Sequence, residues 1–382
     1  MKVLVLSASL GDGHHQASEA IRREFLRQRP AADVHVVDYG RFVNPLFWGV
    51  TRRFYLNSIR LAPRIYGAFY DCTMAISPDS LVQRRLNTIG LRRLREYLRA
   101  QEPDLVVCVY PTAAGVMSRL REMGATDAAL ATVVTDYAVH SQWLHSVVDM
   151  LFVGCEEVRD AIIERGYSPE KVRATGIPIR RMFAGPVDRG CARAALGIPP
   201  RARAVLLMGG ASGVLSEIDS MPRLLRDLDG DTRVLAVCGR DERLRRRLQA
   251  QASRFGHDHM RVFGFVDRVH ELMAAADVIV TKAGGLTTTE ALVMNLPMII
   301  YSALPGQEEQ NARYLAGRGA ALEARNLSEL HSHLRELLPS ESRLAGMRAA
   351  ARDIARPHAA RDMVGTMLDF VRSPTRLQAT PA

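Results

Sequence analysis

The sequence has almost no lysine. It contains 51 basic residues, of which only Lys2, Lys171 and Lys282 are lysine, against 41 acidic residues, so the formal net charge is +10. A positive charge of this size is compatible with a protein that binds nucleic acid or another anionic surface. A strong preference for arginine also follows from genome composition, however, so the charge alone does not select that class of function.

Long hydrophobic runs are missing as well. A membrane-spanning helix needs about 18 or more consecutive apolar residues, and the longest uncharged run, 291–307, is interrupted by Asn295 and Pro297. At the start of the chain, the apolar run 3–6 is too short for the hydrophobic region of a secretory signal. We therefore expect a cytoplasmic protein without a membrane span, whose first apolar run forms a β-strand.

Cysteine pairs suited to a disulfide framework or a zinc site are absent. The cysteines are odd in number, far apart and without a Cys-x-x-Cys pair: Cys72, Cys108, Cys155, Cys191 and Cys238. The stretch Asp227-Leu228-Asp229 matches an Asp-x-Asp metal signal, but it lies in a polar turn where aspartate is common. We expect reduced thiols, no metal site and no cofactor.

The chain of 382 residues is long enough for two or three domains, and its hydrophobic pattern predicts two. Short apolar runs alternate with helical patterns, which is typical of βαβ units around a parallel sheet. The expected strands are 3–7, 34–38, 105–110, 131–135, 151–153 and 172–175, and then 204–208, 234–238, 261–263, 278–281, 298–301 and 320–322. The predicted fold class is α/β, with two doubly wound Rossmann-like domains facing a central cleft.

A proline-rich stretch divides the two series of strands. Pro178, Pro186, Pro199 and Pro200 fall within residues 176–203, together with several glycines. Ligands of doubly wound folds bind at the carboxyl ends of the strands, so the cleft is the expected site. We predict an N-terminal Rossmann-like domain at 1–180, a linker at 181–203, a C-terminal Rossmann-like domain at 204–360, and a C-terminal helix and tail at 361–382.

Glycine-rich turns follow two expected strands of the second domain. Such turns leave backbone N–H groups free at a helix N-terminus, where the partial positive charge suits a phosphate. Glu290 lies one turn inside the later helix, and its carboxylate could accept hydrogen bonds from ribose hydroxyls; alternatively, it only complements the helix dipole. The turn residues that predict a nucleotide diphosphate site are Gly209, Gly210, Gly213, Gly284, Gly285 and Thr287.

The turn after the first expected strand reads Gly11-Asp12-Gly13-His14. An ordinary histidine has a pKa near 6.5, which suits proton abstraction around neutrality, so His14 is a candidate general base. An NAD enzyme is an alternative, because Asp38 stands where a ribose-binding acid is expected, although Gln16 replaces the third glycine of the dinucleotide fingerprint. The other alternative is an incidental histidine in a tight turn.

A polar cluster follows the expected strand 298–301. Pro305 and Gly306 turn the chain, and Gln307 and Glu308 then carry the side chains that hydrogen-bond vicinal sugar hydroxyls. The cluster therefore predicts a sugar-binding edge, or otherwise a solvated helix start.

The first domain combines aromatic and basic residues in one segment. Residues 42–70 hold eight of the 23 aromatics, and 51–99 hold ten arginines against three acids. Amphipathic aromatics favour the lipid headgroup boundary and arginines attract anionic lipids, which predicts membrane docking; in the alternative, the aromatics are core and the arginines a solvated face. A basic stripe is expected along one helix through 85–99. The candidate membrane and acceptor residues are Trp48, Arg52, Arg53, Arg85, Arg92 and Arg99.

Five motifs together resemble a known family. They are Gly-Asp-Gly-His at 11–14, VVTDYAVHSQWLH at 133–145, ATGIPI at 174–179, KAGGLTTTEAL at 282–292 and PGQEEQNA at 305–312. This set is similar to the glycolipid-forming glycosyltransferases: the plant-plastid monogalactosyldiacylglycerol synthases and the bacterial processive diacylglycerol glucosyltransferases, relatives of the peptidoglycan lipid-linked N-acetylglucosaminyltransferase. The resemblance runs from about residue 1 to 350. It implies a GT-B fold, a UDP-sugar donor in the C-terminal domain at 204–360, a lipid acceptor in the N-terminal, membrane-docking domain at 1–180, and inversion at the anomeric carbon.

The resemblance also implies roles for single residues. Glu290 would hold the donor ribose, Gly284, Gly285 and Thr287 the diphosphate, and Gln307 and Glu308 the hexose. Gly264, Phe265 and Val266 would lie against the uracil, mostly through their backbone. His14 falls on the family's proposed base, with Asp136 nearby on the acceptor side. Two departures are that the family more commonly has Gly-Gly-Gly-His or Gly-Asn-Gly-His at 11–14, and that Gly209-Gly210-Ala211-Ser212-Gly213 matches only loosely.

These observations predict an inverting enzyme that transfers a hexose from a UDP-sugar to diacylglycerol or a related lipid hydroxyl. Its expected partners are the UDP-hexose, the lipid acceptor and the anionic inner face of the cell membrane, without nucleic acid. A UDP-sugar epimerase on the same fold is one alternative, although a soluble substrate would not need the aromatic and basic segment. A protein that binds an anionic surface or nucleic acid is the other.

Overall fold

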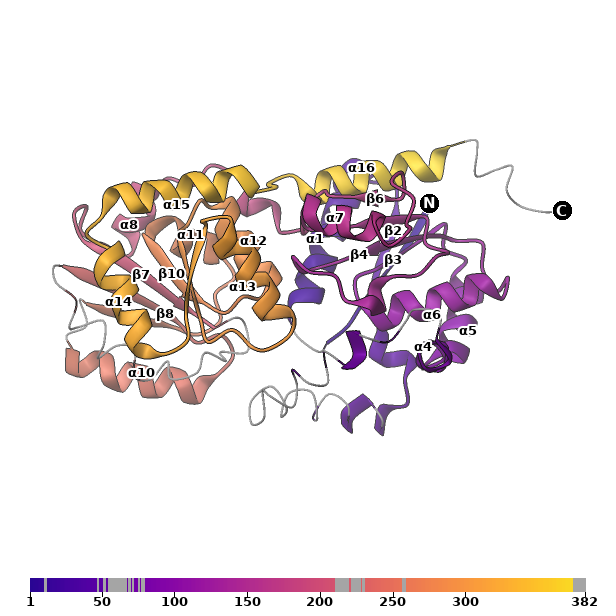
Figure 1. Ribbon diagram of the computed structural model, residues 1–382, viewed down its shortest axis with the longest axis horizontal. Coiled ribbons are helices and arrows are strands. Elements are labelled where there is room, and N and C mark those ends of the chain that lie inside the picture. The colour runs from indigo at the N-terminus through magenta and orange to yellow at the C-terminus, as the bar shows by residue number, and fades with distance from the viewer. Residues whose placement is uncertain are drawn as a thin grey trace. The chain divides into compact units, whose positions relative to one another are not determined.

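The chain folds into two compact units, shown in Figure 1. Unit 1 comprises Met1–Arg180, Leu304–Gln307 and His358–Ala382, and unit 2 comprises Arg181–Ala303 and Glu308–Pro357. The computed structural model describes residues 1–9, 12–46, 48–50, 53, 67, 70, 72–74, 76, 80–209, 220, 228, 231–255 and 259–373.

A six-stranded parallel sheet forms the centre of unit 1, with the strand order β2-β1-β3-β4-β5-β6. The order reverses between β1 and β3, so the carboxyl ends of these two strands form the switch point at which such sheets bind ligands. In register, Leu6 of β1 lies between Val37 of β2 and Cys108 of β3. The strands are β1 (Lys2–Ser7), β2 (Asp33–Asp38), β3 (Leu105–Cys108), β4 (Ala129–Val133), β5 (Met150–Phe152) and β6 (Val172–Arg173).

Helices from both ends of the chain cover this sheet. The last helix, α16, packs against the first, α1, and the side-chain amide of Gln28 donates a 2.9 Å hydrogen bond to the carbonyl oxygen of Arg361. Residues 358–373 therefore belong to unit 1. The helices of unit 1 are α1 (Asp12–Gln28), η1 (Tyr39–Phe42), α4 (Leu81–Leu86), α5 (Leu91–Gln101), α6 (Pro111–Glu122), η2 (Ser141–Trp143), α7 (Glu156–Ile163) and α16 (Ala359–Arg372).

Unit 2 is built on a second six-stranded parallel sheet, with the order β12-β11-β10-β7-β8-β9. Its switch point lies between β7 and β10. The strands are β7 (Arg203–Met208), β8 (Thr232–Val237), β9 (Met260–Phe263), β10 (Val278–Thr281), β11 (Met298–Tyr301) and β12 (Ala321–Ala324). The helices are η3 (Arg181–Phe183), α8 (Arg189–Ala195), α10 (Glu242–Phe255), α11 (Val269–Ala275), α12 (Gly285–Val293), α13 (Gln307–Gly317), α14 (Leu327–Leu337) and α15 (Glu341–Ile354).

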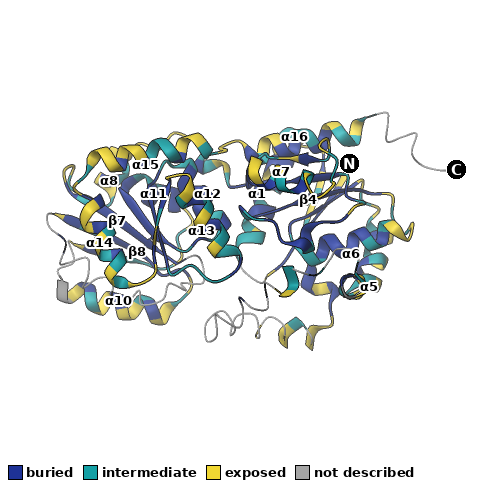
Figure 2. Cartoon of the chain, viewed as in Figure 1, coloured by how far each residue is buried: buried dark blue, intermediate teal, exposed yellow. Residues whose placement is uncertain are grey.

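The strands carry the core of each unit. Every residue of β3, β10 and β11 is buried, as Figure 2 shows for the two sheets. Strands that are covered by helices on both faces read as continuous apolar runs, and these are the runs that the sequence contains. The predicted α/β class with two doubly wound sheets is confirmed, and each described strand falls on a predicted run.

Two predictions differ from the structure: the turn at 11–14 and the single helix through 85–99. Helix α1 begins at Asp12, so His14 lies in its first turn instead of in a loop before it. The expected basic helix through 85–99 is wrong: α4 ends at Leu86, and α5 begins only after Gly90, which has a φ of +82°. A left-handed residue interrupts a helix, and glycine adopts that conformation without steric cost. Arg85 therefore lies on a different helix from Arg92 and Arg99.

One buried carboxylate holds the start of unit 2 together. Asp277, with a side chain only 3% exposed, precedes β10 and contacts Arg193 of α8 at 3.4 Å and Arg189 at 2.7 Å. It also accepts a 2.8 Å hydrogen bond from the backbone N–H of Ala204 at the start of β7. Desolvation lowers the pKa of the buried Arg193, and the charge of Asp277 opposes this shift. Asp277 thus compensates a buried cation and joins β7, β10 and α8.

We expect Asp277→Ala to destabilise unit 2 by about 3–5 kcal/mol, because breaking a buried pair leaves an uncompensated charge. Glu336→Ala is the control: it removes an ion pair with Arg343 in the same unit, in which both side chains are about half exposed, and should cost at most about 1 kcal/mol. Urea unfolding followed by circular dichroism measures both changes. Equal, small effects would contradict the structural role of Asp277.

Candidate functional site

His14 lies at the switch point of the first sheet. It follows β1 by seven residues and occupies the first turn of α1, where the hydroxyl of Ser18 donates a 2.7 Å hydrogen bond to its carbonyl oxygen. Because α1 begins at the carboxyl end of β1, the imidazole is placed at the ligand-binding edge of the sheet.

Side chains from the ends of neighbouring strands surround the imidazole. The ring of Tyr110, just after β3, meets it edge-on at a centroid distance of 5.7 Å, and the ring of Trp143 lies at 6.5 Å. The hydroxyl of Thr135, just after β4, is 3.4 Å from Nδ1 of His14. These three residues were not predicted individually, although Tyr110 and Thr135 end apolar runs that were predicted to be strands.

The environment of His14 keeps its ring neutral. Desolvation lowers the pKa of His14 to about 4, and a hydrogen bond to the backbone of Val109 partly opposes this shift. At neutral pH the ring therefore retains a free lone pair. A neutral imidazole at the carboxyl edge of a sheet can accept a proton from a hydroxyl group, as a general base must.

Asp136 lies close to this group in the chain. It follows Thr135, is half-buried, and comes after β4 at the same carboxyl edge as His14. The structure therefore brings the 135–136 segment and His14 together at one edge of unit 1.

The second sheet has an open helix N-terminus at its switch point. Gly284 is the N-cap of α12 and makes no side-chain cap hydrogen bond, and a Cβ added at this residue would meet nothing within 4 Å. Gly285 begins the helix, and Thr287 in its first turn is half-buried. Gly209 directly follows β7, the strand that lies beside β10 in the sheet. Unsatisfied N–H groups with space in front of them suit a diphosphate.

Two buried polar side chains stand behind this helix start. Glu290 is 8% exposed and lies within α12. Asn311 of α13 is fully buried, and its side-chain N–H donates a 2.9 Å hydrogen bond to the carbonyl oxygen of Ala283, in the turn before α12. Asn311 fixes this turn, and it was missed even though it belongs to the PGQEEQNA motif.

The remaining predicted donor residues lie at the ends of other strands of this sheet. Gln307 and Glu308 are half-buried and open α13 after β11, the neighbour of β10. Gly264, Phe265 and Val266 follow β9 at the opposite side of the switch point. Phe265 is 49% exposed, and the guanidinium of Arg240 lies 4.7 Å from its ring centroid.

Some predicted residues lie outside the described part of the chain: Gly11, Arg52, Gly210 and Gly213. Arg53 is described and exposed, as are Arg85, Arg92 and Arg99.

Of the aromatics expected at a headgroup boundary, Phe42 and Tyr70 are buried instead, and Trp48 is half-buried against the core of unit 1. The membrane expectation is therefore wrong for Phe42 and Tyr70, because the ring of Phe42 packs against those of Tyr39 and Tyr97, and the ring of Tyr70 packs against that of His140. Within the described ranges, no group of three or more histidine, cysteine or carboxylate side chains is placed so that it could hold a metal ion.

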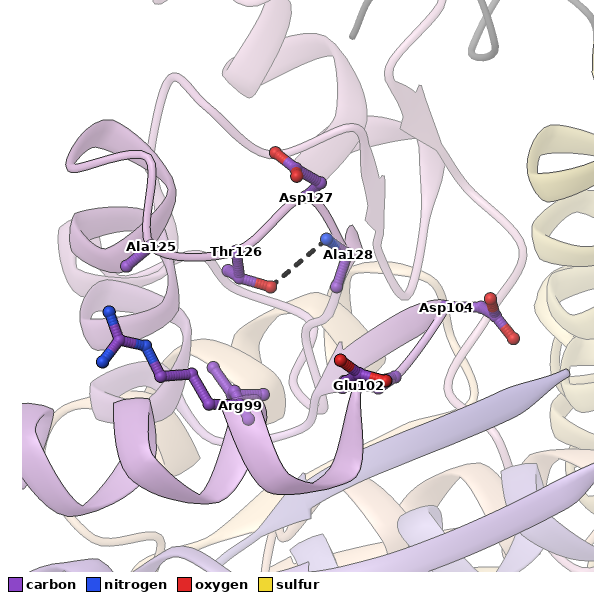
Figure 3. A pocket seen from close by; sticks show the side chains of 9 residues that line it. Arg99, Glu102, Asp104, Ala125, Thr126, Asp127 and Ala128 are labelled. Carbon is purple, nitrogen blue, oxygen red and sulfur yellow. Dashed lines mark hydrogen bonds between the residues drawn. The ribbon is translucent and has the colours of Figure 1, made fainter.

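A pocket of about 600 Å³ lies at the other edge of the first sheet (Figure 3). Its walls are the end of α5 and the turn before β4, so it lies at the amino ends of β3 and β4, away from His14. Glu102, Asp104 and Asp127 line it together with Arg99. Three carboxylates repel a phosphate, which excludes this pocket as the diphosphate site.

Family models match both halves of the chain. The model described as monogalactosyldiacylglycerol (MGDG) synthase matches residues 14–179, and the glycosyltransferase family 28 C-terminal domain matches residues 204–363. The two matches fall on the two sheets and include His14, Asp136, Glu290 and Gln307.

Known proteins resemble the chain over nearly its whole length. A processive diacylglycerol beta-glucosyltransferase of Bacillus cereus (strain AH187) is 31% identical over 367 residues, covering 96% of this chain and 93% of that relative. The crystal structure of MurG from Acinetobacter baumannii has a TM-score of 0.63 at 15% identity, covering 96% of this chain and 99% of that one.

A UDP-GlcNAc 2-epimerase from Neisseria meningitidis, bound to UDP-GlcNAc, has a TM-score of 0.62 at 13% identity, covering 97% of this chain and 100% of that one. At such identities the two solved structures show a shared GT-B fold and no more. The sequence match over 96% of the chain goes further. The chain therefore belongs to the glycolipid-forming GT-B family of the monogalactosyldiacylglycerol synthases and processive diacylglycerol glucosyltransferases.

Proposed function

We propose that this protein is an inverting hexosyltransferase that moves a hexose from a UDP-sugar to diacylglycerol or a closely related lipid hydroxyl. The observation that carries the proposal is the 31% identity, over 96% of the chain, to a relative named as a processive diacylglycerol beta-glucosyltransferase. That name makes UDP-glucose the first donor to test. The epimerase alternative has only a likeness of fold at 13% identity in its support.

The donor is assigned to the carboxyl edge of the second sheet. The open N-terminus of α12 at Gly284 and Gly285 would bind the diphosphate, with Thr287 beside it, and the buried Glu290 would accept hydrogen bonds from the ribose hydroxyls. Gln307 and Glu308 would hold the hexose. The 264–266 segment, which follows β9, would lie against the uracil. Four strand spacings, or roughly 19 Å, separate β9 from β11 in the sheet.

The acceptor is assigned to His14. Its neutral imidazole would take the proton of the lipid hydroxyl while the oxygen attacks the anomeric carbon from the face opposite UDP. The new C–O bond forms as the bond to the diphosphate breaks, and UDP leaves with the bonding electron pair. Helix N–H groups at α12 would stabilise the departing charge, so the mechanism needs no metal or other cofactor.

We further propose that the protein works on the anionic inner face of the cell membrane. No helix within the described part of the chain is long and apolar enough to cross a bilayer. Exposed arginines such as Arg53, Arg85 and Arg92 each contribute about 1 kcal/mol near an anionic surface. Arg99 lines the acidic pocket at the amino edge of the first sheet, so it adds little to this attraction.

Replacing Glu290 should weaken UDP binding. Charge-assisted hydrogen bonds are worth about 1.5–3 kcal/mol, so Glu290→Ala should raise the dissociation constant for UDP roughly ten- to a hundredfold. Glu323→Ala, which changes an exposed carboxylate on β12, is the control and should leave UDP affinity unchanged. Isothermal calorimetry measures both. An unchanged affinity in folded Glu290→Ala would disprove the ribose assignment.

Replacing His14 should slow turnover without weakening donor binding. Loss of a general base typically costs about 10²- to 10⁴-fold in rate, while the proposed UDP contacts lie in unit 2. The neighbouring His15 is exposed, so His15→Ala is the matched control and should retain activity. Transfer from labelled UDP-glucose to diacylglycerol, measured beside UDP affinity, tests both variants. Near-normal turnover by His14→Ala would move the base elsewhere, with Asp136 the next candidate.

The pH dependence should follow the lowered pKa of His14. A base with a pKa of about 4 stays unprotonated down to that pH, so the acid limb of kcat/KM should fall near pH 4 and not near 6.5. UDP binding measured over the same range controls for acid unfolding. A limb centred near 6.5 would show that a solvated histidine, and not His14 in this environment, is the base.

A further inference from the structure

A short helical stretch, described at residues 45, 46 and 48–50 and called the 45–50 helix below, follows η1 at the carboxyl edge of the first sheet. Asn44 caps it: the side-chain oxygen accepts a 3.0 Å hydrogen bond from the N–H of Leu46, and the carbonyl oxygen accepts one of 2.8 Å from the N–H of Trp48. Pro45 occupies the first position, where its fixed φ suits a helix start. The local sequence therefore specifies this helix.

The two faces of the helix differ. Trp48 points inward: its ring lies 6.4 Å from that of Tyr110, and a Cβ on Gly40 would come within 2.3 Å of its Nε1. Leu46 and Val50, four residues apart and therefore on one face, are 82% and 70% exposed. A single exposed leucine is ordinary. Two nearly bare aliphatic side chains on a helix that is anchored by a tryptophan indicate an apolar tip that is held outward.

Positive charge lies beside this apolar tip. Arg93, at the start of α5, is exposed and donates a 3.1 Å hydrogen bond to the carbonyl oxygen of Val43. Arg41 is also exposed, and its guanidinium lies 5.3 Å from the ring centroid of Tyr97. Among the described residues, neither guanidinium pairs with a carboxylate. An apolar tip near cations that pair with no described carboxylate complements a bilayer with anionic headgroups.

The apolar tip is also connected to the candidate base. Trp48 contacts Tyr110, and Tyr110 contacts His14. Two ring contacts thus separate the helix from the atom that would deprotonate the acceptor. A surface that receives Leu46 and Val50 would therefore lie on the same side of unit 1 as this chain of rings, with Trp48 and Tyr110 between it and His14.

We propose that the 45–50 helix is the element that enters the membrane. Leu46 and Val50 insert among the acyl chains of an anionic bilayer, Arg41 and Arg93 bind at headgroup level, and the Trp48–Tyr110 contact holds the lipid surface beside His14. The inference rests on the proposed lipid acceptor, and it assigns insertion to aliphatic side chains and not to the aromatic ones.

The test is sedimentation with phosphatidylcholine vesicles, with and without phosphatidylglycerol, at low and high salt. Leu46→Gln combined with Val50→Gln should weaken binding at least tenfold at both salt concentrations, because insertion is not screened. Arg41→Gln combined with Arg93→Gln should remove the preference for phosphatidylglycerol and act mainly at low salt. Met123→Gln is the control: Met123 is 49% exposed at the end of α6, at the opposite edge of the sheet.

Two outcomes would overturn the proposal. The first is wild-type vesicle binding by the Leu46 and Val50 double variant. The second is weaker vesicle binding together with an altered oligomeric state of the double variant in analytical ultracentrifugation, which would make this face a contact between copies of the protein. UDP affinity and transfer to detergent-dispersed diacylglycerol are measured in parallel, since their absence in the wild type would reject the proposed function independently of vesicle binding.

Discussion

In a sheet whose strands are all parallel, every strand ends at the same edge and every following helix begins there. This constraint places the candidate residues of each unit. At the carboxyl edge of the first sheet it gathers His14, Tyr110 and Thr135 from three separate stretches of sequence. At the second sheet it brings the N-terminus of α12 and the start of α13 together, with Asn311 fixing the turn between β10 and α12. Neither group depends on residues that are close in sequence.

The strands could be predicted because their burial is recorded in consecutive residues of the sequence. A strand that is buried on both faces must be apolar throughout, so β3, β10 and β11 stand out as uninterrupted runs. The glycine-rich turns could be recognised for a similar reason, because an open helix start such as that at Gly284 has no side chain in front of it. The candidate site for the sugar donor, at the carboxyl edge of the second sheet, could therefore be predicted from local patterns together with the family resemblance.

Other features depend on contacts between distant residues. Whether Phe42 faces lipid or core is decided by Tyr39 and Tyr97 around it, and whether 85–99 is one helix is decided by the left-handed Gly90 beside Phe42. The pKa of His14 is set by desolvation and, in the opposite direction, by a hydrogen bond to the backbone of Val109. The rings and strands that bury the imidazole come from other parts of the chain. No window of sequence contains that information, since the same histidine in a solvated turn would titrate near 6.5.

The packing of α16 against α1 means that unit 1 is assembled from segments on both sides of unit 2 in the sequence. Helix α1, which carries His14 in its first turn, precedes all of unit 2 in the chain, whereas its partner α16 follows unit 2. Until α16 has been made, the surface of α1 around Gln28 has no cover. Unit 1 therefore reaches its final form only after unit 2 has been synthesised. His14 is thus held on a complete unit 1 only once residues on both sides of unit 2 have been made.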